Sequence, residues 1–292
     1  MRAPVSALTD GKVNRVGERI SFGLFIFVHL ACFAAIWSGL SGAAVALAIV
    51  LFWTRMFVIT AGYHRYFSHR SYKTSRWFQF LLAVAGTTCV EKGPIWWAAT
   101  HRRHHRFSDE PADVHSPVQR GFWYSHVGWI LGTEHVDTDV GAVRDLARYP
   151  ELRWLGKYHV LPPIALAVAC FAIAGWSGLV VGFVWSTVLL WHSTFTINSL
   201  AHVFGSRRYA TTDDSRNNWL LAILTLGEGW HNNHHHYMAS ARQGFFWWEI
   251  DVAYYILRGM EAIGLVWDLK RPPSHVLAPN GATDGEGARD AA

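Results

Sequence analysis

Charged residues are scarce in this 292-residue sequence, in which Asp, Glu, Lys and Arg together make up 16%, against roughly 25% in soluble domains. With 51% hydrophobic residues and a mean hydropathy of +0.12, the composition excludes intrinsic disorder and argues against an ordinary soluble enzyme. Cysteine is also rare. Three cysteines cannot form a disulfide framework, and Cys32 and Cys170 lie in apolar runs where they are expected to pack as small hydrophobic residues.

Several motifs of redox and nucleotide-binding proteins are missing as well. There is no Cys-x-x-Cys cluster site, no His-Pro-Gly-Gly haem-domain signature and no Gly-rich dinucleotide loop. Any electrons that the protein uses are therefore expected to come from a separate donor. The first 19 residues are polar, so no cleavable signal peptide is expected.

Two long stretches contain no charged residue at all, 20–54 and 158–206. Because a membrane-spanning helix needs about 20 residues, each stretch is long enough for a helical hairpin. Turn-forming residues lie near the middle of each, at 38–42 and 175–179. The sequence thus predicts an all-α integral membrane protein with four transmembrane helices in two hairpins, at about 20–38, 43–63, 160–176 and 179–200. A buried helix pair in a soluble protein is the alternative.

The distribution of Lys and Arg predicts the orientation of these hairpins. Neither hairpin turn carries a Lys or Arg, whereas the N-terminal segment has four, the segment 64–157 has thirteen and the segment after Ser206 has eight. The positive-inside rule places both termini and the central segment in the cytosol. Arg55 falls within the second predicted span. It is expected to lie near the cytosolic surface or to face a polar interior, because a charge in the bilayer is costly.

The remaining segments complete the predicted organisation. The 14 apolar residues from Trp77 to Val90 are too few for a span and suit an interfacial or re-entrant element. We expect a cytosolic N-terminal segment at 1–19 and a membrane domain with a cytosolic helical cap at 20–270. The Pro-, Gly- and Ala-rich residues 271–292 are predicted to form a flexible tail.

Histidine is unusually abundant, with 17 residues against 5 lysines. Eight of them fall in three clusters, at the end of the second predicted span, after the interfacial segment and after the fourth span: His64 and His69; His101, His104 and His105; His231, His234 and His235. The i, i+3, i+4 spacing of the last two clusters puts their imidazoles on one helix face. His64 and His69 would diverge by about 140° on a regular helix, so they can converge only near a helix end. Asn198 and His202 share a face at the end of the fourth span.

These clusters indicate a metal site, because imidazole binds iron, zinc, copper and nickel well. Nine candidate ligands are too many for one ion and about right for two. The alternative is a set of interfacial histidines hydrogen-bonded to water or headgroups. His236 directly follows a cluster but turns away from its shared face. No ligand role is expected for the histidines outside the repeated spacing: His29, His115, His126, His135, His159, His192 and His275.

The sequence resembles the membrane-bound fatty acid desaturases of the stearoyl-CoA desaturase type over about residues 20–270. The matching motifs lie at 64–74, 100–109, 198–202 and 227–235, and His231 argues against the front-end desaturases, which usually carry Gln there. The resemblance implies a non-haem di-iron site. It implies one iron held by His64, His69, His101, His105 and His235, and a second held by His104, His202, His231 and His234, with Asn198 acting through a water.

Other residues near the clusters are candidates for supporting roles. The acidic residues Asp109, Asp113, Asp213, Asp214 and Glu228 could orient the ligating imidazoles, or be ordinary surface charges. Trp96 and Trp97 could line a substrate tunnel, or anchor the protein at the membrane interface.

The resemblance implies an oxygen-dependent oxidoreductase. Oxygen and two electrons would remove two hydrogens from a saturated acyl-CoA or acyl lipid, leaving a cis double bond, expected between carbons 9 and 10, and two waters. A ferredoxin or cytochrome-type donor with its reductase would dock on the basic cytosolic face, and no nucleic acid partner is expected. The excess of Arg over Lys hints at a bacterial plasma membrane. A related di-iron hydroxylase, or a non-enzymatic metal-binding or transport protein, are the alternatives.

Overall fold

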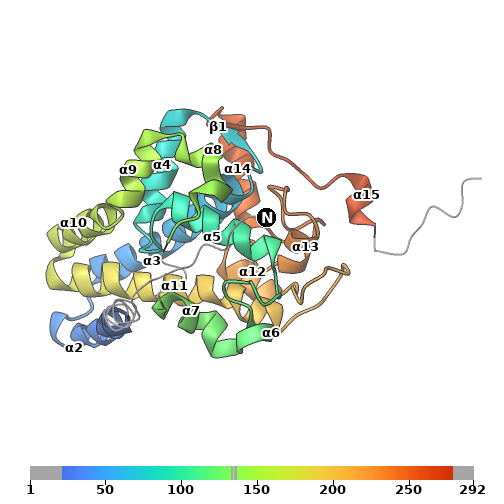
Figure 1. Cartoon of the computed structure of the whole chain (residues 1–292). Helices are drawn as coiled ribbons and strands as arrows, with labels where there is room; N and C mark the ends of the chain where they lie inside the picture. Colours follow the sequence, from blue (N-terminus) through green and yellow to red (C-terminus); the bar gives the residue numbers. More distant parts are fainter. Residues whose placement is uncertain (1–21, 133, 135–136, 279–292) are drawn as a thin grey trace, which may run out of the picture.

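The fold is almost entirely helical, as the sequence predicts (Figure 1). The computed structural model describes residues 22–132, 134 and 137–278. Two strands of two residues each, β1 (Lys73–Thr74) and β2 (Val266–Trp267), pair antiparallel and join distant parts of the chain. The predicted N-terminal segment 1–19 lies outside the described residues.

Long apolar helices account for the two uncharged stretches. Helix α3 (Gly42–Phe57) continues into the π-helix η2 (Val58–Ser68), and α10 (Leu161–Ser177) is followed by η5 (Gly178–Trp185), α11 (Ser186–Asn198) and η6 (Leu200–His202). In the described chain these two continuous segments, Gly42–Ser68 and Leu161–His202, are long and apolar enough to cross a membrane. A shorter apolar helix, Phe22–Ser38, precedes them and includes η1 (Cys32–Ala34) and α2 (Ala35–Ser38).

The long segment 161–202 folds back on itself at the predicted turn. Gly175 has φ 59°, a left-handed conformation that glycine adopts without strain. Gly178 then packs so tightly on the Cys170 carbonyl that a Cβ there would lie 2.0 Å from its oxygen. The turn touches the one after the first helix, because Ser177 Oγ donates to Gly39 O (2.9 Å) and accepts from Ser41 N (3.1 Å). Both turns therefore lie at the same end of the molecule.

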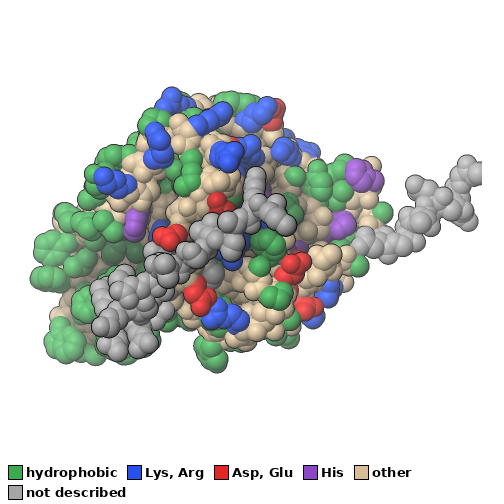
Figure 2. Space-filling view, viewed as in Figure 1, with side chains coloured by type: hydrophobic (Ala, Val, Ile, Leu, Met, Phe, Trp, Pro, Cys, Tyr) green, Lys and Arg blue, Asp and Glu red, His purple; other side chains and the backbone are tan. Residues whose placement is uncertain are grey.

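The surface divides into an apolar end and a basic region. Figure 2 shows hydrophobic side chains gathered over α2 and α10, and Lys and Arg side chains over β1, α4 (Arg76–Thr87) and α8 (Arg144–Ala147). At the apolar end Trp37 is 81% exposed and Ile36 76% exposed. Apolar patches this large mark a surface that contacts lipid or protein, which fits association with a membrane.

Arg55 faces a polar interior, as the sequence analysis allowed. Its side chain is 2% exposed, and its guanidinium donates to Thr187 Oγ1 (2.8 Å), Ser186 Oγ (2.5 Å) and the Thr88 carbonyl (3.3 Å). These bonds satisfy the charge within the apolar segments and tie α3 to the start of α11.

The histidine-bearing part packs on one end of the apolar helices (Figure 1). The apolar run predicted as an interfacial element forms the 12-residue helix α4, which buries Leu82 and Ala83 and exposes Trp77 and Leu81. The other elements of this part are α5 (Pro94–Arg106), α6 (Pro117–Arg120), η3 (Tyr124–Gly128), α7 (Trp129–Leu131), η4 (Val140–Val143), α8, α9 (Pro150–Lys157), α12 (Trp219–Leu224), α13 (His231–His236), α14 (Val252–Ala262) and α15 (Ser274–Leu277).

The described part of the predicted tail contains a short helix. Residues 271–278 include α15, whose Val276 packs in a small core with Tyr209 and Phe245. His236 Nε2 lies 3.2 Å from the Val276 carbonyl. Pro, Gly and Ala content alone did not reveal these contacts, and residues 279–292 lie outside the described chain.

Candidate metal centre

The first histidine cluster is carried by the π-helix η2. Its i→i+5 hydrogen bonds include His69 N to His64 O at 3.2 Å, so residues five apart lie one above the other. The two imidazole centroids are 4.8 Å apart. The sequence analysis required a helix end for these rings to converge. The helix does end at Ser68, but it is the π-helical winding that aligns His64 with His69.

The other two clusters each divide between two groups of imidazoles. In α5, His101 and His105 turn to one side and His104 to the other; in α13, His231 and His235 turn to one side and His234 to the other. At about 100° per residue, residues four apart diverge by only about 40°, so both helices keep the i, i+4 pair together and send the i+3 ring to the opposite group.

The resulting groups correct the predicted partition between the two metal ions. The five-histidine group consists of His64, His69, His101, His105 and His234, and the four-histidine group of His104, His202, His231 and His235. In each group the candidate ligand atoms all lie within 4.8 Å of one another. His234 and His235 are thus exchanged relative to the prediction. The prediction kept the i, i+4 pair of α5 together, but in α13 it paired His231 with the i+3 residue His234.

In the five-histidine group the Nε2 atoms converge. His64 and His234 are 3.0 Å apart at Nε2, and the pairs His69–His101, His101–His105 and His105–His234 are each 2.9 Å apart. Imidazole nitrogens bound at about 2.1 Å and at right angles around one ion would lie about 3.0 Å apart. The set therefore fits a single metal ion.

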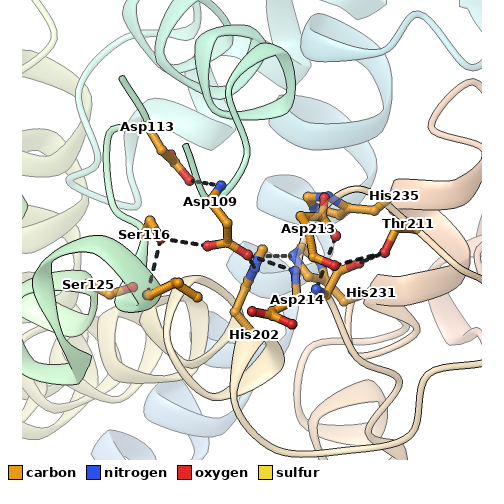
Figure 3. Close-up of polar contacts among 12 residues, drawn as sticks. Asp109, Asp113, Ser116, Ser125, His202, Thr211, Asp213, Asp214, His231 and His235 are labelled. Atoms are coloured by element: carbon orange, nitrogen blue, oxygen red, sulfur yellow. Dashed lines mark hydrogen bonds and ion pairs between the residues drawn. The ribbon is translucent and has the colours of Figure 1, made fainter. Parts of the chain in front are cut away.

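The four-histidine group is built around carboxylates (Figure 3). Nδ1–H of His202 donates to Asp109 (2.8 Å) and that of His104 donates to Asp113 (2.9 Å). His235 Nδ1–H donates to Asp213 in the same way. Each bond leaves Nε2 free as a ligand, and His235 Nε2 is buried with no hydrogen-bond partner among the described residues. This group also fits a metal ion.

The five acidic residues singled out from the sequence have different roles. Four of them contact ligand imidazoles. Three are the aspartates just described, and the fourth is Glu228, which pairs with His64 Nδ1 and also accepts from Arg65 (3.1 Å). Asp214 is the exception. Its backbone N–H donates to Asp109 (2.8 Å), but its carboxylate pairs with Arg207 at the surface.

The electrostatics of the site favour the neutral form of several rings and the charged form of the acids. Burial and neighbouring imidazoles hold the pKa of His101, His105 and His234 well below the ordinary value, and neutral imidazole is the form that binds metal. Burial alone would raise the pKa of Asp113, but the charge and hydrogen bond of His104 hold it below its usual range. His235 lowers the pKa of Asp213 likewise.

A largely apolar cavity of about 430 Å³ leads to both histidine groups. His64 and His101 of one group and His104 and His231 of the other line it, together with Asn198. The predicted tunnel residues Trp96 and Trp97 also lie in its wall. The cavity therefore brings candidate metal ligands and candidate tunnel residues to one space.

Trp97 is held in place at the metal end of this cavity. Its indole N–H donates to Glu91 (3.0 Å), which also accepts from Thr194 Oγ1 (2.9 Å). Its ring stacks on His101 with a centroid distance of 4.9 Å. Glu91 lies between Val90 and Lys92, both at positive φ, a strained turn for a β-branched residue such as Val90. The sequence analysis did not single out Glu91 or Thr194.

Residues inside the third cluster support it in a way that the spacing did not reveal. Asn232 and Asn233 are fully buried. Asn232 accepts from Tyr209 N (2.8 Å), and Asn233 donates to Glu249 (2.8 Å). The Gln243 amide lies 3.3 Å from Nδ1 of His234. The sequence did contain a signal for these residues, because they are polar and lie between histidines at ligand spacing.

The isolated histidines have other surroundings. The ring of His115 packs against that of His104 with a centroid distance of 4.3 Å, and His115 forms with His104 and Asp113 a third possible metal group. This group shares His104 with the four-histidine group, so it does not stand alone. His236 stacks on Tyr209 at 3.9 Å and belongs to neither group.

The fold and the site define a membrane-associated protein with two histidine-rich groups that could each hold a metal ion. A family model described as fatty acid desaturase matches residues 20–266. The chain belongs to the fatty acid desaturase family, and it is an oxidoreductase that desaturates acyl chains.

Three relatives illustrate the range of similar proteins. The chain is 39% identical over 268 residues to the sn-1 stearoyl-lipid 9-desaturase of Anabaena variabilis, covering 91% of this chain and 97% of that one. It is 39% identical to Delta-9 acyl-lipid desaturase 1 of Arabidopsis thaliana, covering 85% and 81%. It is 35% identical to an acyl-CoA 5-desaturase of Anemone leveillei, covering 84% and 77%.

Proposed function

We propose that the protein introduces a cis double bond between carbons 9 and 10 of a saturated acyl chain carried on a membrane lipid. The observation that carries this proposal is the apolar cavity whose wall contains imidazoles of both histidine groups. An acyl chain matches its apolar lining. The relatives from Anabaena variabilis and Arabidopsis thaliana that are named as acting on position 9 of lipid-bound chains support the position and the carrier.

The nine histidines hold two iron ions in this proposal, with Asn198 acting on the second through a water. Methylene groups have no acidic proton, so acid–base residues cannot remove their hydrogens. The iron pair would supply the oxygen chemistry for this step. The carboxylates of Asp109, Asp113 and Asp213 keep their imidazoles in the ligand tautomer.

Trp97 sets which carbons react in this proposal. Because Glu91 and the His101 ring fix its indole on two sides, it presents a rigid surface beside the five-histidine group. A chain that bends around it would hold one pair of carbons next to the metal ions. The apolar wall also excludes water from the reacting carbons.

The membrane arrangement follows the charge distribution. The helices at 22–38, 42–68, 161–175 and 176–202 would be four spans in a bacterial plasma membrane, and residues 20–270 a single membrane domain. The turns near Gly39 and Gly175 would face away from the cytosol, and the histidine-bearing cap would lie in it. The Lys and Arg side chains over β1, α4 and α8 (Figure 2) would receive an acidic ferredoxin or cytochrome-type donor, supplied by its reductase.

Expression in a host that lacks its own desaturase tests this function. We expect a new monounsaturated fatty acid in the membrane lipids, with the double bond located by mass spectrometry. His104→Ala should abolish it. His236→Gln, which changes a histidine next to a cluster but outside both groups, should preserve it. Hydroxylated lipid, or unchanged lipid with metal uptake, would overturn the proposal.

A further inference from the structure

The first apolar helix, Phe22–Ser38, forms part of the cavity wall without being embedded in the protein. None of its residues is buried. Leu24 and Phe25 line the cavity, and so does Val160 just before α10. Leu24 is 60% exposed and Val160 52% exposed. The cavity therefore reaches the described surface beside these two residues.

This part of the rim is apolar and lies at one end of the apolar helices. Leu24 is near the start of the first helix and Val160 is at the start of the third apolar segment. The turn after the first helix and the turn near Gly175 touch through Ser177. Both starts therefore lie at the end away from the turns, where a bilayer around the helices would reach the rim.

Three histidines outside the metal groups connect this helix to the rest of the protein. Nε2 of His29 is 2.9 Å from Nε2 of His192. His192 Nδ1 is 3.0 Å from His126 Nε2, and His126 Nδ1 is 3.0 Å from Ser199 Oγ. His29 Nδ1–H donates to the Phe25 carbonyl (2.7 Å), so Nε2 of a neutral His29 must accept its bond from His192.

The bond between His29 and His192 fastens the cavity-lining part of the first helix to α11. His29 lies one turn after Phe25, whose ring stacks on Trp191 at 6.0 Å. Breaking the bond would leave an imidazole nitrogen unpaired in apolar surroundings, which is costly. The other end of the helix is fastened separately, by Trp185 Nε1 donating to the Cys32 carbonyl (2.9 Å) and by Ser177 at the turn. The helix is thus anchored at 32–41 and latched at His29.

We propose that residues 22–29 form a side gate through which an acyl chain passes between the bilayer and the cavity, with the His29–His192 hydrogen bond as its latch. The inference rests on the proposed function and deepens it. A chain that enters sideways never leaves the hydrocarbon phase, so the substrate is an acyl chain of a lipid already in the membrane. Neither His29 nor His192 lines the cavity, so the latch can be changed without changing the site.

A reversible tether tests the gate. In full-length protein with Cys32, Cys89 and Cys170 replaced by Ala, His29→Cys and His192→Cys would be joined by a short bis-methanethiosulfonate linker. The protein would be held in nanodiscs of saturated phosphatidylcholine and supplied with oxygen and a reduced donor protein. The control is the pair Ser41→Cys and Ser177→Cys with the same linker, which fastens the turn that follows the same helix.

The tethered gate is expected to form no more than one double bond per enzyme, and removal of the linker with a thiol should restore repeated turnover. The control tether should leave turnover unchanged. Repeated turnover by the tethered enzyme would overturn the gate while leaving the proposed function intact. Absence of any double bond in the wild-type protein would instead remove the proposed function, and the gate with it.

Two single variants test the latch if the cysteine proteins do not fold. His29→Leu removes the latch, and Trp185→Phe removes a hydrogen bond from the anchored part of the same helix. After a single turnover, His29→Leu should release the unsaturated lipid faster than wild type, and Trp185→Phe should release it at the wild-type rate. Equal release from all three proteins would contradict the latch.

Discussion

The two histidine groups differ in how their imidazoles are supported. Among the described residues, three carboxylates serve the four-histidine group, through Asp109, Asp113 and Asp213, whereas the five-histidine group has Glu228 alone, which it shares with Arg65. A carboxylate on Nδ1 raises the basicity of the ligand nitrogen and adds negative charge near the ion. The difference indicates that two ions in this site would not be equivalent, and that neutralising carboxylates would affect mainly one of them.

The largest expected effects come from two neighbours in the sequence that serve opposite groups. His234→Ala removes a ligand from the five-histidine group and His235→Ala removes one from the four-histidine group. Both variants should lose all measurable desaturation. Mössbauer spectra of iron-57 protein should show the loss of a different iron signal in each variant. Loss of the same signal from both would contradict the observed partition.

Neutralising a supporting carboxylate should have a smaller effect. Asp113→Asn keeps the shape but weakens the partner of His104, so activity and iron affinity should fall about 10- to 100-fold. The matched control is Asp214→Asn, because that carboxylate pairs with Arg207 at the surface. Steady-state rates and iron titrations measure both variants. If activity and iron affinity fell as far in Asp214→Asn as in Asp113→Asn, the contact with the imidazole would not be the cause.

A change in the cavity wall should alter where the double bond forms more than how fast it forms. Glu91→Leu removes the acceptor of both Trp97 and Thr194, which frees the indole beside His101. We expect a mixture of positional isomers in place of one product. Mass spectrometry of dimethyl disulfide adducts locates each double bond. A single product at the wild-type position would exclude Trp97 as the residue that sets the register.

The smallest expected effect concerns metal-free protein at mildly acidic pH. The folded protein holds the pKa of His101, His105 and His234 well below the ordinary value, whereas in the unfolded chain these rings bind protons below about pH 6.5. The unfolded state therefore binds more protons, and stability falls as the pH falls below that value. Thermal unfolding in detergent from pH 7.5 to 5.5 measures this. His101→Gln should flatten the dependence, and an unchanged slope would contradict the assignment.

Much of the site could be predicted from the sequence, because ligand spacing is a local property. The nine histidines were identified as candidates, and residues such as Asp113 were found because acidic residues lie close to the clusters. The exchange of His234 and His235 was missed because rings three and four residues away from His231 share one helix face, and the sequence does not specify the group to which each turns. The π-helix at His64 and the Glu91–Thr194 contacts depend on tertiary packing.

The fold was predictable to a similar degree. Uncharged stretches located the apolar helices and the turn at Gly175, because hydropathy is summed over many residues. The packing of Val276 against Tyr209 and Phe245 was not predictable, since a short helix of four residues has no periodicity to detect. The series of hydrogen bonds from His29 to Ser199 was also not predictable, because it joins residues from three distant segments.

Iron content is the most direct test of two unequal metal sites. Purified wild-type protein should contain two irons per chain. A variant with Asp109, Asp113 and Asp213 all changed to Asn should keep the iron of the five-histidine group and lose the other, leaving about one per chain. Loss of both irons together, or retention of both at wild-type affinity, would contradict the account.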